Sequence, residues 1–166
     1  MLIRPTEEAD WPTLKTIRLA ALQDAPSAFG VSYQGAAADS DERWRQRASS
    51  SGLPEFWLAF DGAVAVGLVG AGIDQQGRYN LIAMWVAPAR RGSQAARRLV
   101  DAVKARAVER GHSRVVLDVA PDNHRAAGFY QREGFVFVDE WEALASHPGI
   151  RVQRMEWLPA AGQASR

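Results

Sequence analysis

The segment YNLIAMWVAPARRGSQAARRLVDAVKARAVERGHSRVVLDV, residues 79–119, decides the fold because two strands flank a helix in it. Residues 79–86 and 114–119 are apolar stretches of strand length. Between them, apolar residues recur at helical spacing until Gly111, a typical helix stop. The face of this helix is formed by Ala96, Leu99, Val103 and Ala107. A strand, a helix and a strand in this order predict two parallel strands that lie side by side.

The elements on both sides of this segment extend one sheet. Periodicity and turn residues predict a strand at 2–5, helices at 11–24 and 39–50, strands at 55–60 and 63–73, a helix at 123–134, and strands at 135–141 and 150–157. Asp10 is the expected N-cap of the first helix, and Asp61-Gly62 is the expected hairpin turn.

These elements predict an α+β fold in the order β-α-α-β-β-β-α-β-α-β-β. Its sheet is mixed and mainly antiparallel, with one parallel β-α-β junction and flanking helices. We expect a single domain over residues 1–158 and a disordered tail over 159–166.

Composition argues against several classes of protein. The 166 residues carry a formal net charge of +1, so no overall field attracts the chain to nucleic acid or to a membrane. The chain has no cysteine, so disulfides, thiolate metal ligands and a cysteine nucleophile are all excluded. His112, His124 and His147 lack metal-ligand spacing, so no metal is expected. The N-terminus has no apolar leader, and we expect a cytoplasmic protein.

The turn at residues 86–96 has the features of an anion site. Its small residues leave the backbone accessible, and the first amides of a helix have no internal acceptors. Arg90 and Arg91 add positive charge. Taken alone, such a turn is more often a solvated basic surface than a phosphate site.

The segment NHRAAGFYQREGF, residues 123–135, strengthens the phosphate interpretation. Together with the turn, it resembles the GNAT superfamily of acyl-CoA-dependent N-acyltransferases. The turn matches the cofactor motif of that family from Arg91 to Ala96, and the later segment matches its Asn-x-x-Ala, Tyr and Gly-Phe positions. The order of elements resembles that fold from residue 2 to about 158. One position departs: Gln94 replaces the usual glycine, where its side chain would either crowd the pyrophosphate or hydrogen-bond to it.

The resemblance implies acetyl-CoA as cosubstrate, bound where the two parallel strands splay apart. It places the pantetheine arm along the end of the first strand and the pyrophosphate on the amides of the turn. Asn123 is implied to hydrogen-bond the cofactor, and it is also a good N-cap. The implied cofactor-binding residues are Met84, Trp85, Val86, Arg91, Gly92, Ser93, Gln94, Ala95, Ala96, Asn123 and Tyr130.

Tyr130 resembles the general acid of the family, which would protonate the departing CoA thiolate. The alternative is a core tyrosine whose hydroxyl is held by a hydrogen bond. An acceptor amine must also lose a proton, but residues 79–86 contain no acid. Asp118 and Glu55 are the candidates in the sequence, and either is equally a solvated strand-end charge. No base is therefore assigned.

The implied reaction is transfer of an acetyl group from acetyl-CoA to a primary amine, on a small molecule or a peptide, by direct attack in a ternary complex. No nucleic-acid or membrane partner is expected, and the resemblance implies a homodimer. Residues 11–50 and a loop at 142–149 are expected to shape the acceptor site. Their acidic residues, which would attract a cationic amine or form ordinary surface charge, are Asp24, Asp39, Asp41, Glu42 and Glu142.

Two other functions compete with catalysis. Gln94 and the missing strand acid favour a non-catalytic module that binds or senses CoA. A nucleotide-binding regulator is the third hypothesis. The sequence GLVGAG at 67–72 invites such an interpretation, but it lies inside a predicted strand with no helix after it. Close packing against the strand explains these glycines better.

Overall fold

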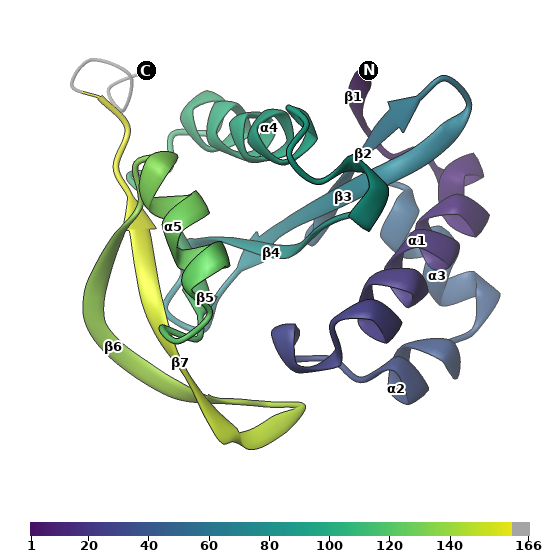
Figure 1. The fold of residues 1–166 in the computed structure, drawn as a ribbon. Coiled ribbons are helices and arrows are strands. Elements are labelled where there is room, and N and C mark those ends of the chain that lie inside the picture. Colours follow the sequence, from purple (N-terminus) through teal and green to yellow (C-terminus); the bar gives the residue numbers. More distant parts are fainter. Residues whose placement is uncertain (161–166) are drawn as a thin grey trace.

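The computed structural model describes residues 1–160, which form one seven-stranded sheet with helices on both faces (Figure 1). The strands are β1 (Leu2–Pro5), β2 (Glu55–Asp61), β3 (Val64–Ile73), β4 (Tyr79–Val86), β5 (Val115–Val119), β6 (Val136–Leu144) and β7 (His147–Trp157). The helices are α1 (Trp11–Asp24), α2 (Tyr33–Ala37), α3 (Asp41–Ala48), α4 (Ala95–Glu109) and α5 (His124–Arg132). Short 3₁₀ segments are η1 (Glu8–Asp10), η2 (Pro26–Ala28) and η3 (Pro88–Arg90).

The sheet has the strand order β1-β2-β3-β4-β5-β7-β6. Every neighbouring pair is antiparallel except β4 and β5, which the crossover helix α4 connects as a parallel pair. The predicted fold class is confirmed, including the single parallel junction in the middle of the sheet. The last strand β7 enters between β5 and β6, a position that follows from the tertiary structure and not from the order of elements.

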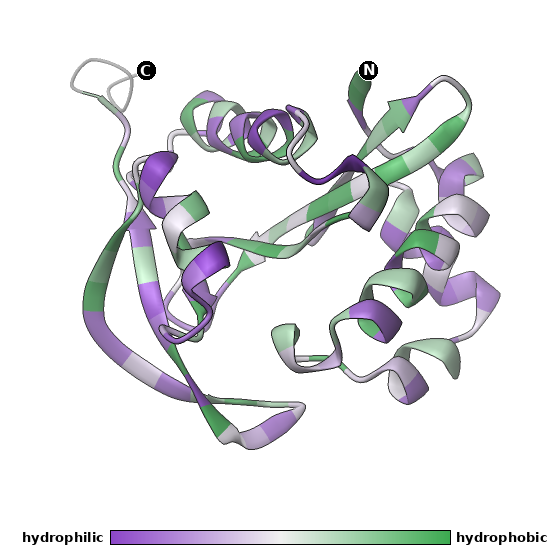
Figure 2. Ribbon diagram, viewed as in Figure 1, coloured by the Kyte–Doolittle hydropathy of each residue, from purple (hydrophilic) through white to green (hydrophobic). Residues whose placement is uncertain are grey.

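Two hydrophobic cores lie on opposite faces of the sheet because successive strand residues point to opposite sides. On β2, Phe56 and Leu58 pack with α1 and α3, whereas Trp57 and Ala59 pack with α4. Figure 2 shows the hydrophobic residues concentrated along the central strands, with polar residues on the outer faces of the helices. The sheet therefore separates the two cores, and the loops at its split centre extend from strands that are packed on both faces.

The glycines of β3 serve close packing, as expected. A Cβ atom at Gly70 would lie 2.8 Å from the ring of Phe56, and one at Gly67 would lie 3.1 Å from a methyl carbon of Leu99. Both contacts are shorter than an ordinary van der Waals separation, so a side chain at either position would displace a core neighbour. No phosphate loop is present here, because the residues run as a continuous strand.

Two local features in the first half of the chain differ from the expected elements, which included no helix between residues 24 and 39 and placed the hairpin turn at Asp61-Gly62. The stretch between the first two long helices contains the short helix α2, whose N-cap Ser32 accepts a hydrogen bond from the amide of Gly35 at 3.0 Å. In the first hairpin, Asp61 pairs with Val64, so the two loop residues are Gly62 and Ala63. Gly62 has a φ of 62°, which is the conformation that a tight hairpin turn requires.

Asp10 occupies the N-cap position of α1, but its side chain does not cap that helix. Its carboxylate accepts a hydrogen bond from the amide of Glu7 at 2.8 Å and pairs with Arg4 at 2.7 Å. It thus closes the preceding 3₁₀ turn and ties it to β1. Asp10 was correctly predicted as the N-cap residue, but its carboxylate binds Glu7 and Arg4 and not the first amides of α1.

The C-terminal half differs in the expected loop at 142–149. Strand β6 continues to Leu144 and β7 begins at His147, so these residues form a long hairpin with a tight connection. Of the expected tail, residues 161–166 lie outside the described part of the chain. Within residues 1–160, no helix combines the length and the apolar character needed to cross a membrane.

Candidate active site

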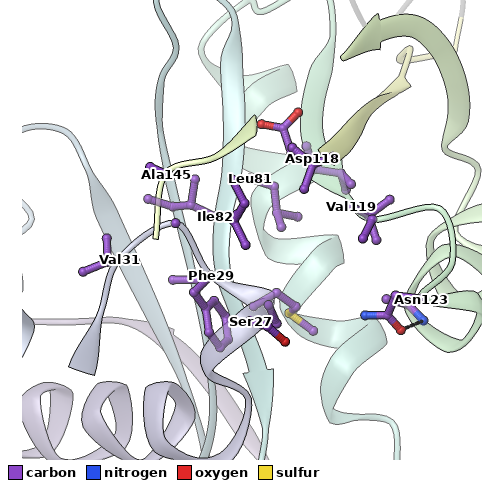
Figure 3. A pocket seen from close by; sticks show the side chains of 18 of the residues that line it. Ser27, Phe29, Val31, Leu81, Ile82, Asp118, Val119, Asn123 and Ala145 are labelled. Carbon is purple, nitrogen blue, oxygen red and sulfur yellow. Dashed lines mark hydrogen bonds between the residues drawn. The ribbon is translucent and has the colours of Figure 1, made fainter. Parts of the chain in front are cut away.

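A cavity of about 460 Å³ lies beside the split between β4 and β5. Its walls come from four regions: Leu81–Met84 of β4, residues 117–120 at the end of β5, Ser27–Val31 after α1, and residues 142–145 at the end of β6. Asn123, Ala126 and Tyr130 of α5 complete it. Figure 3 shows Phe29, Leu81, Asp118 and Asn123 around this space.

The split exists because β4 and β5 pair only at their first residues, Tyr79 with Val115 and Asn80 with Val116. Beyond this point, β4 contains a bulge opposite β3, where the register shifts between Leu68 and Gly70. Ala83 in the bulge has a φ of 59°, which costs roughly 1–2 kcal/mol for a residue with a side chain. The bulge bends β4, and backbone groups after Asn80 are left without partners from β5.

The predicted anion site begins where β4 ends. Gly92 has a φ of 85°, and α4 starts at Ala95. Three of the turn amides already have acceptors: Arg91 donates to Pro88 O, Ser93 to Arg90 O, and Ala95 to the hydroxyl of Ser93. Within residues 1–160, no such acceptor is found for the amides of Gly92, Gln94 and Ala96. These three donors lie at the positive end of a 15-residue helix, which favours an anion.

The two arginines of the turn are occupied by protein partners. Arg91 donates to Asp24 at 2.6 Å and to the carbonyl of Val86 at 3.2 Å, and Arg90 forms an ion pair with Asp61. Trp85 also donates to Asp24, at 3.0 Å. The pKa of Asp24 is lowered first by the hydrogen bond from Trp85 and then by that from Arg91.

These contacts change the expected roles of Arg91 and Asp24. The side chains of Arg91 and Trp85 hold the turn against the end of α1, so Arg91 is better described as a residue that positions the turn than as a phosphate ligand. Asp24, for which attraction of a cationic acceptor and ordinary surface charge were the two alternatives, forms an ion pair with Arg91.

Gln94 stands at the N-cap position of α4 with φ −81° and ψ 0°. This backbone conformation does not require glycine, so the departure from the family motif causes no strain. The side chain of Gln94 forms no capping hydrogen bond and is exposed. It is therefore available to a ligand at the turn.

Asn123 and Tyr130 are brought to the same cavity by α5. Asn123 is the N-cap of this helix and accepts a hydrogen bond from the amide of Ala126 at 3.3 Å. Its cap role and its place on the cavity wall coexist. Tyr130 is buried between Phe129 and Phe135, whose ring centroids lie 5.2 and 5.7 Å from its own. Burial raises the pKa of the Tyr130 phenol well above its usual range, so the hydroxyl stays protonated.

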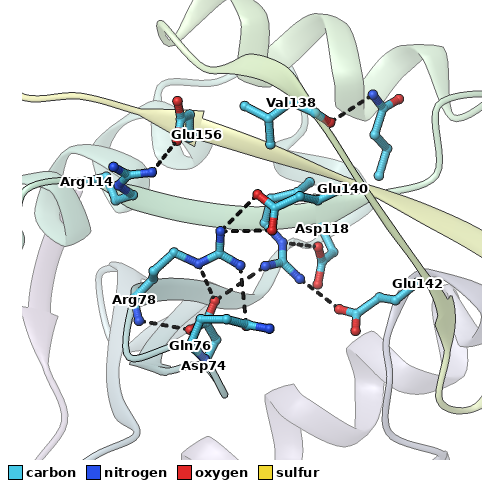
Figure 4. A network of polar contacts seen from close by, with 11 residues as sticks. Asp74, Gln76, Arg78, Arg114, Asp118, Val138, Glu140, Glu142 and Glu156 are labelled. Atoms are coloured by element: carbon cyan, nitrogen blue, oxygen red, sulfur yellow. Dashed lines mark hydrogen bonds and ion pairs between the residues drawn. The ribbon is translucent and has the colours of Figure 1, made fainter.

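Asp118 and Glu142 supply carboxylates to the cavity, although they are 24 positions apart in the sequence (142 − 118). Arg154 on β7 is the cross-strand partner of Asp118 and holds both, donating to Asp118 at 2.7 Å and to Glu142 at 2.9 Å. Figure 4 shows the wider network, in which Asp74 also pairs with this guanidinium. The strand order β5-β7-β6 is what brings these groups together.

The charge of Asp118 acts on Glu142. A hydrogen bond with Asp118 raises the pKa of Glu142, and burial and the negative charge of Asp118 raise it further, against the attraction of Arg154. A carboxylate with a raised pKa is a better proton acceptor than an ordinary one. Of the two candidate bases named from the sequence, Asp118 is therefore the one that lines the cavity. Glu142 lines the same cavity and interacts with Asp118.

Glu55, the other candidate base, is not part of the site. Its side chain is buried on β2 and pairs with Arg106 at 3.2 Å and with Arg110 at 3.9 Å, both on or next to α4. It does not line the cavity. The acidic residues of the second helical region are also paired elsewhere: Asp39 with Arg47, Asp41 with Lys15, and Glu42 with Arg45.

Arg18 and residues 27–31 line the cavity and lie within residues 11–50, which were expected to shape the acceptor site, but sequence reasoning singled out none of them. One signal was present for Arg18, because it lies four positions after Leu14 and therefore at the border of the apolar stripe of α1. Nothing in the local sequence indicates that residues 27–31 reach across to β4. Among the described residues, no cluster of acidic or histidine side chains could hold a metal ion.

We expect Glu142→Gln to raise Tm at pH 7 by about 1–3 °C. Folding raises the pKa of Glu142, so the charged form costs stability at neutral pH, and a neutral isostere removes that cost. The difference should shrink as the pH falls towards 4, because Glu142 then becomes protonated in both states. Thermal unfolding measured from pH 4 to 8 tests this.

Glu140→Gln is the matched control, two residues earlier on the same strand. Arg78 lowers the pKa of Glu140 through a hydrogen bond, so its charge is stabilising and its loss should lower Tm slightly at pH 7. A fall in Tm for Glu142→Gln as well would mean that the ion pair with Arg154 outweighs the repulsion from Asp118.

A sheet split at its parallel pair, a helix that starts beside the split and a buried phenol in the cavity form the arrangement that the resemblance to acetyl-CoA-dependent N-acetyltransferases implies. The chain belongs to the acetyltransferase (GNAT) family, whose family model matches residues 17–135. A comparison with curated proteins finds no match.

Solved structures share this fold at low sequence identity. An acetyltransferase of the GNAT family from Streptococcus pneumoniae is 22% identical, with a TM-score of 0.76 over 95% of this chain and 98% of its own. A ribosomal-protein-alanine N-acetyltransferase from Brucella melitensis is 19% identical, with a TM-score of 0.70 over 96% and 100%. A candidate streptothricin acetyltransferase from Bacillus anthracis str. Ames, in complex with acetyl coenzyme A, is 16% identical, with a TM-score of 0.59 over 67% and 65%.

Proposed function

We propose that the chain transfers an acetyl group from acetyl-CoA to a primary amine by direct attack within a ternary complex. The observation that carries the proposal is the single cavity at the β4–β5 split, which has Asn123 and Tyr130 on one wall and Asp118 and Glu142 on another. A phenol and a carboxylate pair on one cavity provide a proton donor and a proton acceptor for the same reaction.

The residues at the split fit acetyl-CoA. The backbone of Met84, Trp85 and Val86 follows the point where β5 leaves β4, so it can accept an extended arm as an added strand. The amides of Gly92, Gln94 and Ala96 point away from internal acceptors at the start of α4, as a pyrophosphate site requires. A Cβ at Gly92 would meet no atom within 4 Å, so the approach to this turn is open.

The protein residues then manage two protons. Acetyl-CoA supplies an acyl thioester, which the neutral amine attacks. An alkylammonium acceptor with a pKa of about 10.4 is mostly charged at pH 7, so it first releases one proton to solvent through the Asp118–Glu142 pair. The pair then accepts the second proton, which the attacking nitrogen loses as the C–N bond forms and the C–S bond breaks. Tyr130 donates its phenolic proton to the departing sulfur and thereby neutralises the thiolate. The Tyr130 phenolate is reprotonated when the proton held by the carboxylate pair returns to it through solvent.

The acceptor does not follow from the fold. One structural neighbour is named for a ribosomal-protein alanine and another for an aminoglycoside, both at 20% identity or less. A thiol-release assay with acetyl-CoA against polyamines, aminoglycosides, amino acids and peptides tests the proposed activity. Amine-dependent thiol release supports it. Tight acetyl-CoA binding without turnover on any amine supports the non-catalytic module, and stabilisation by NAD or ATP but not by CoA supports the nucleotide-binding regulator.

We expect Gln94→Gly to preserve or tighten acetyl-CoA binding. The backbone of Gln94 is already in a region open to any residue, and its side chain makes no cap, so glycine removes only bulk in front of the turn. Calorimetric titration with acetyl-CoA measures the effect, and Tm checks that the start of α4 is intact. Weakening by about tenfold or more, equal to 1.4 kcal/mol, would show that the Gln94 amide helps to hold the pyrophosphate.

The homodimer implied by the family resemblance stays a prediction. Strand β6 is the edge of the sheet on the C-terminal side, and Trp141 on it is exposed. An exposed sheet edge is a suitable surface for pairing with a second copy. Light scattering of the purified chain measures the oligomeric state.

A further inference from the structure

Arg18 of α1 lies on the wall of the cavity, and no carboxylate within residues 1–160 forms an ion pair with it. One of its terminal nitrogens, Nη1, is fully buried and has no hydrogen-bond partner. Its guanidinium carbon stands 4.8 Å from the centre of the Phe29 ring, a contact that satisfies no hydrogen bond. Burial lowers the pKa of Arg18 to about 10, and the positive charge of Arg47 contributes in the same direction.

This environment is unusual within the described part of the chain. The other arginines without a carboxylate partner in residues 1–160 are exposed to solvent: Arg97, Arg98, Arg125, Arg132 and Arg151. A half-buried guanidinium beside a second cation destabilises the fold, because its charge is partly desolvated and repelled. Packing in α1 does not account for the charge, whereas a bound anion in the cavity would.

The charges of the cavity wall are separated by element. Arg18 comes from α1, while Asp118 and Glu142 come from β5 and β6, which lie on the other side of the split (Figure 1). Between them the lining is largely apolar and includes Phe29, Leu81 and Leu144. A ligand that matches this wall carries a positive group, an apolar body and a negative group.

We propose that the acceptor is an amino acid-like molecule, a small primary amine that also carries a carboxylate, and that Arg18 binds this carboxylate. The inference rests on the proposed acetyl transfer and names the acceptor class. With the amine at the carboxylates of Asp118 and Glu142, the anionic end of the acceptor supplies the partner that Arg18 lacks. A guanidinium presents two parallel donors to a carboxylate, which orients the acceptor as well as holding it.

Two matched sets of acceptors test the proposal in the thiol-release assay. One set is phenylalanine, phenylalaninamide and 2-phenylethylamine, and the other is 6-aminohexanoate and its amide, which extend the distance between amine and carboxylate. We expect kcat/KM for the carboxylate-bearing member of at least one set to exceed that of its neutral partners by roughly 10- to 100-fold, as for loss of a hydrogen bond to a charged group.

Variants of Arg18 connect that preference to one side chain. In Arg18→Gln, the ratio of kcat/KM between the acid and its amide should fall to near one, and in Arg18→Lys it should be partly retained. Lys15→Gln is the control, because it removes one positive charge from the same helix, at a residue that pairs with Asp41 and does not line the cavity. It should keep the full ratio. Tm of Arg18→Gln should not fall, because the repulsion from Arg47 is relieved.

The outcomes separate this inference from the proposed function. Amides or simple amines acetylated as well as the acids, or an acid preference that survives Arg18→Gln, would overturn the amino acid-like acceptor while leaving acetyl transfer in place. Acetyl-CoA binding without acetylation of any amine would overturn the proposed function and this inference together. An acid preference that disappears in Arg18→Gln but is kept in Lys15→Gln supports both.

Discussion

Tyr130→Phe is expected to lower kcat by about 10²- to 10⁴-fold while acetyl-CoA binding stays near that of the wild type. The substitution removes only the hydroxyl, and the ring contacts with Phe129 and Phe135 are retained. The phenol lines the cavity, and its hydroxyl has no hydrogen bond with another residue of the described chain. Without that proton, the sulfur must leave as a free thiolate, with a pKa near 8.5 for its thiol.

The pH profile gives a second readout for Tyr130. Because burial raises the pKa of its phenol, the wild type should not lose activity through tyrosine ionisation below about pH 10. Steady-state kinetics together with calorimetric binding of acetyl-CoA separate proton donation from binding. If Tyr130→Phe turns over as fast as the wild type, Tyr130 is a core residue and the proposed acid is wrong.

Tyr79→Phe is the matched control for this experiment. Tyr79, the first residue of β4, is a second buried tyrosine, and its buried hydroxyl has no hydrogen-bond partner within residues 1–160. It stacks on His112 at 4.5 Å, away from the cavity wall. Burial, aided by the charge of Glu55, raises its pKa to about 12, so a raised pKa alone does not distinguish the two residues. Tyr79→Phe should retain full kcat.

Glu142→Gln should reduce kcat/KM at pH 7 by roughly 100-fold, within the range typical of a lost general base. The raised pKa of Glu142 makes it a better proton acceptor than an ordinary carboxylate, and glutamine cannot accept a proton. The loss should shrink as the pH approaches the pKa of the acceptor amine, because free amine then no longer needs the base. Kinetics from pH 6 to 10 measure this.

The same variant is expected to be more stable and less active. This combination distinguishes a proton acceptor from a structural ion pair, whose loss would lower both stability and activity. Glu140→Gln again serves as the control, since Glu140 pairs with Arg78 outside the cavity and should leave kcat/KM unchanged. Full activity of Glu142→Gln would exclude Glu142 as the base and leave Asp118 to be tested by Asp118→Asn.

Much of the architecture could be predicted because it is encoded locally. The helical spacing from Ala96 to Ala107 and the strands on both sides fix the parallel junction, since a right-handed crossover allows little else. The errors fall where local signals compete. Asp10 had two possible partners for one carboxylate, and the loop expected at 142–149 had no apolar periodicity that would mark it as the end of a hairpin.

The residues of the candidate site also fall into two groups, those that the sequence predicted and those that it did not. Tyr130, Asn123 and the turn at 91–96 were identified from short motifs, because each acts through its own backbone or helix position. The roles of the charged residues could not be predicted from the sequence, because each role depends on which residues lie next to the charge in the folded protein. Glu55 and Asp118 are both acids on strands, but one is buried against α4 and the other faces the cavity.

The sequence alone determines the order of helices and strands, the one parallel strand pair and the turn that begins α4. Those features depend on contacts between residues close in the chain, whose periodicity is visible in any one segment. The tertiary structure decided that Asp24 neutralises Arg91, that β7 inserts Arg154 between Asp118 and Glu142, and that Arg18 is left facing the cavity unpaired. These depend on strand order and on which helix covers which face, and long-range packing sets both.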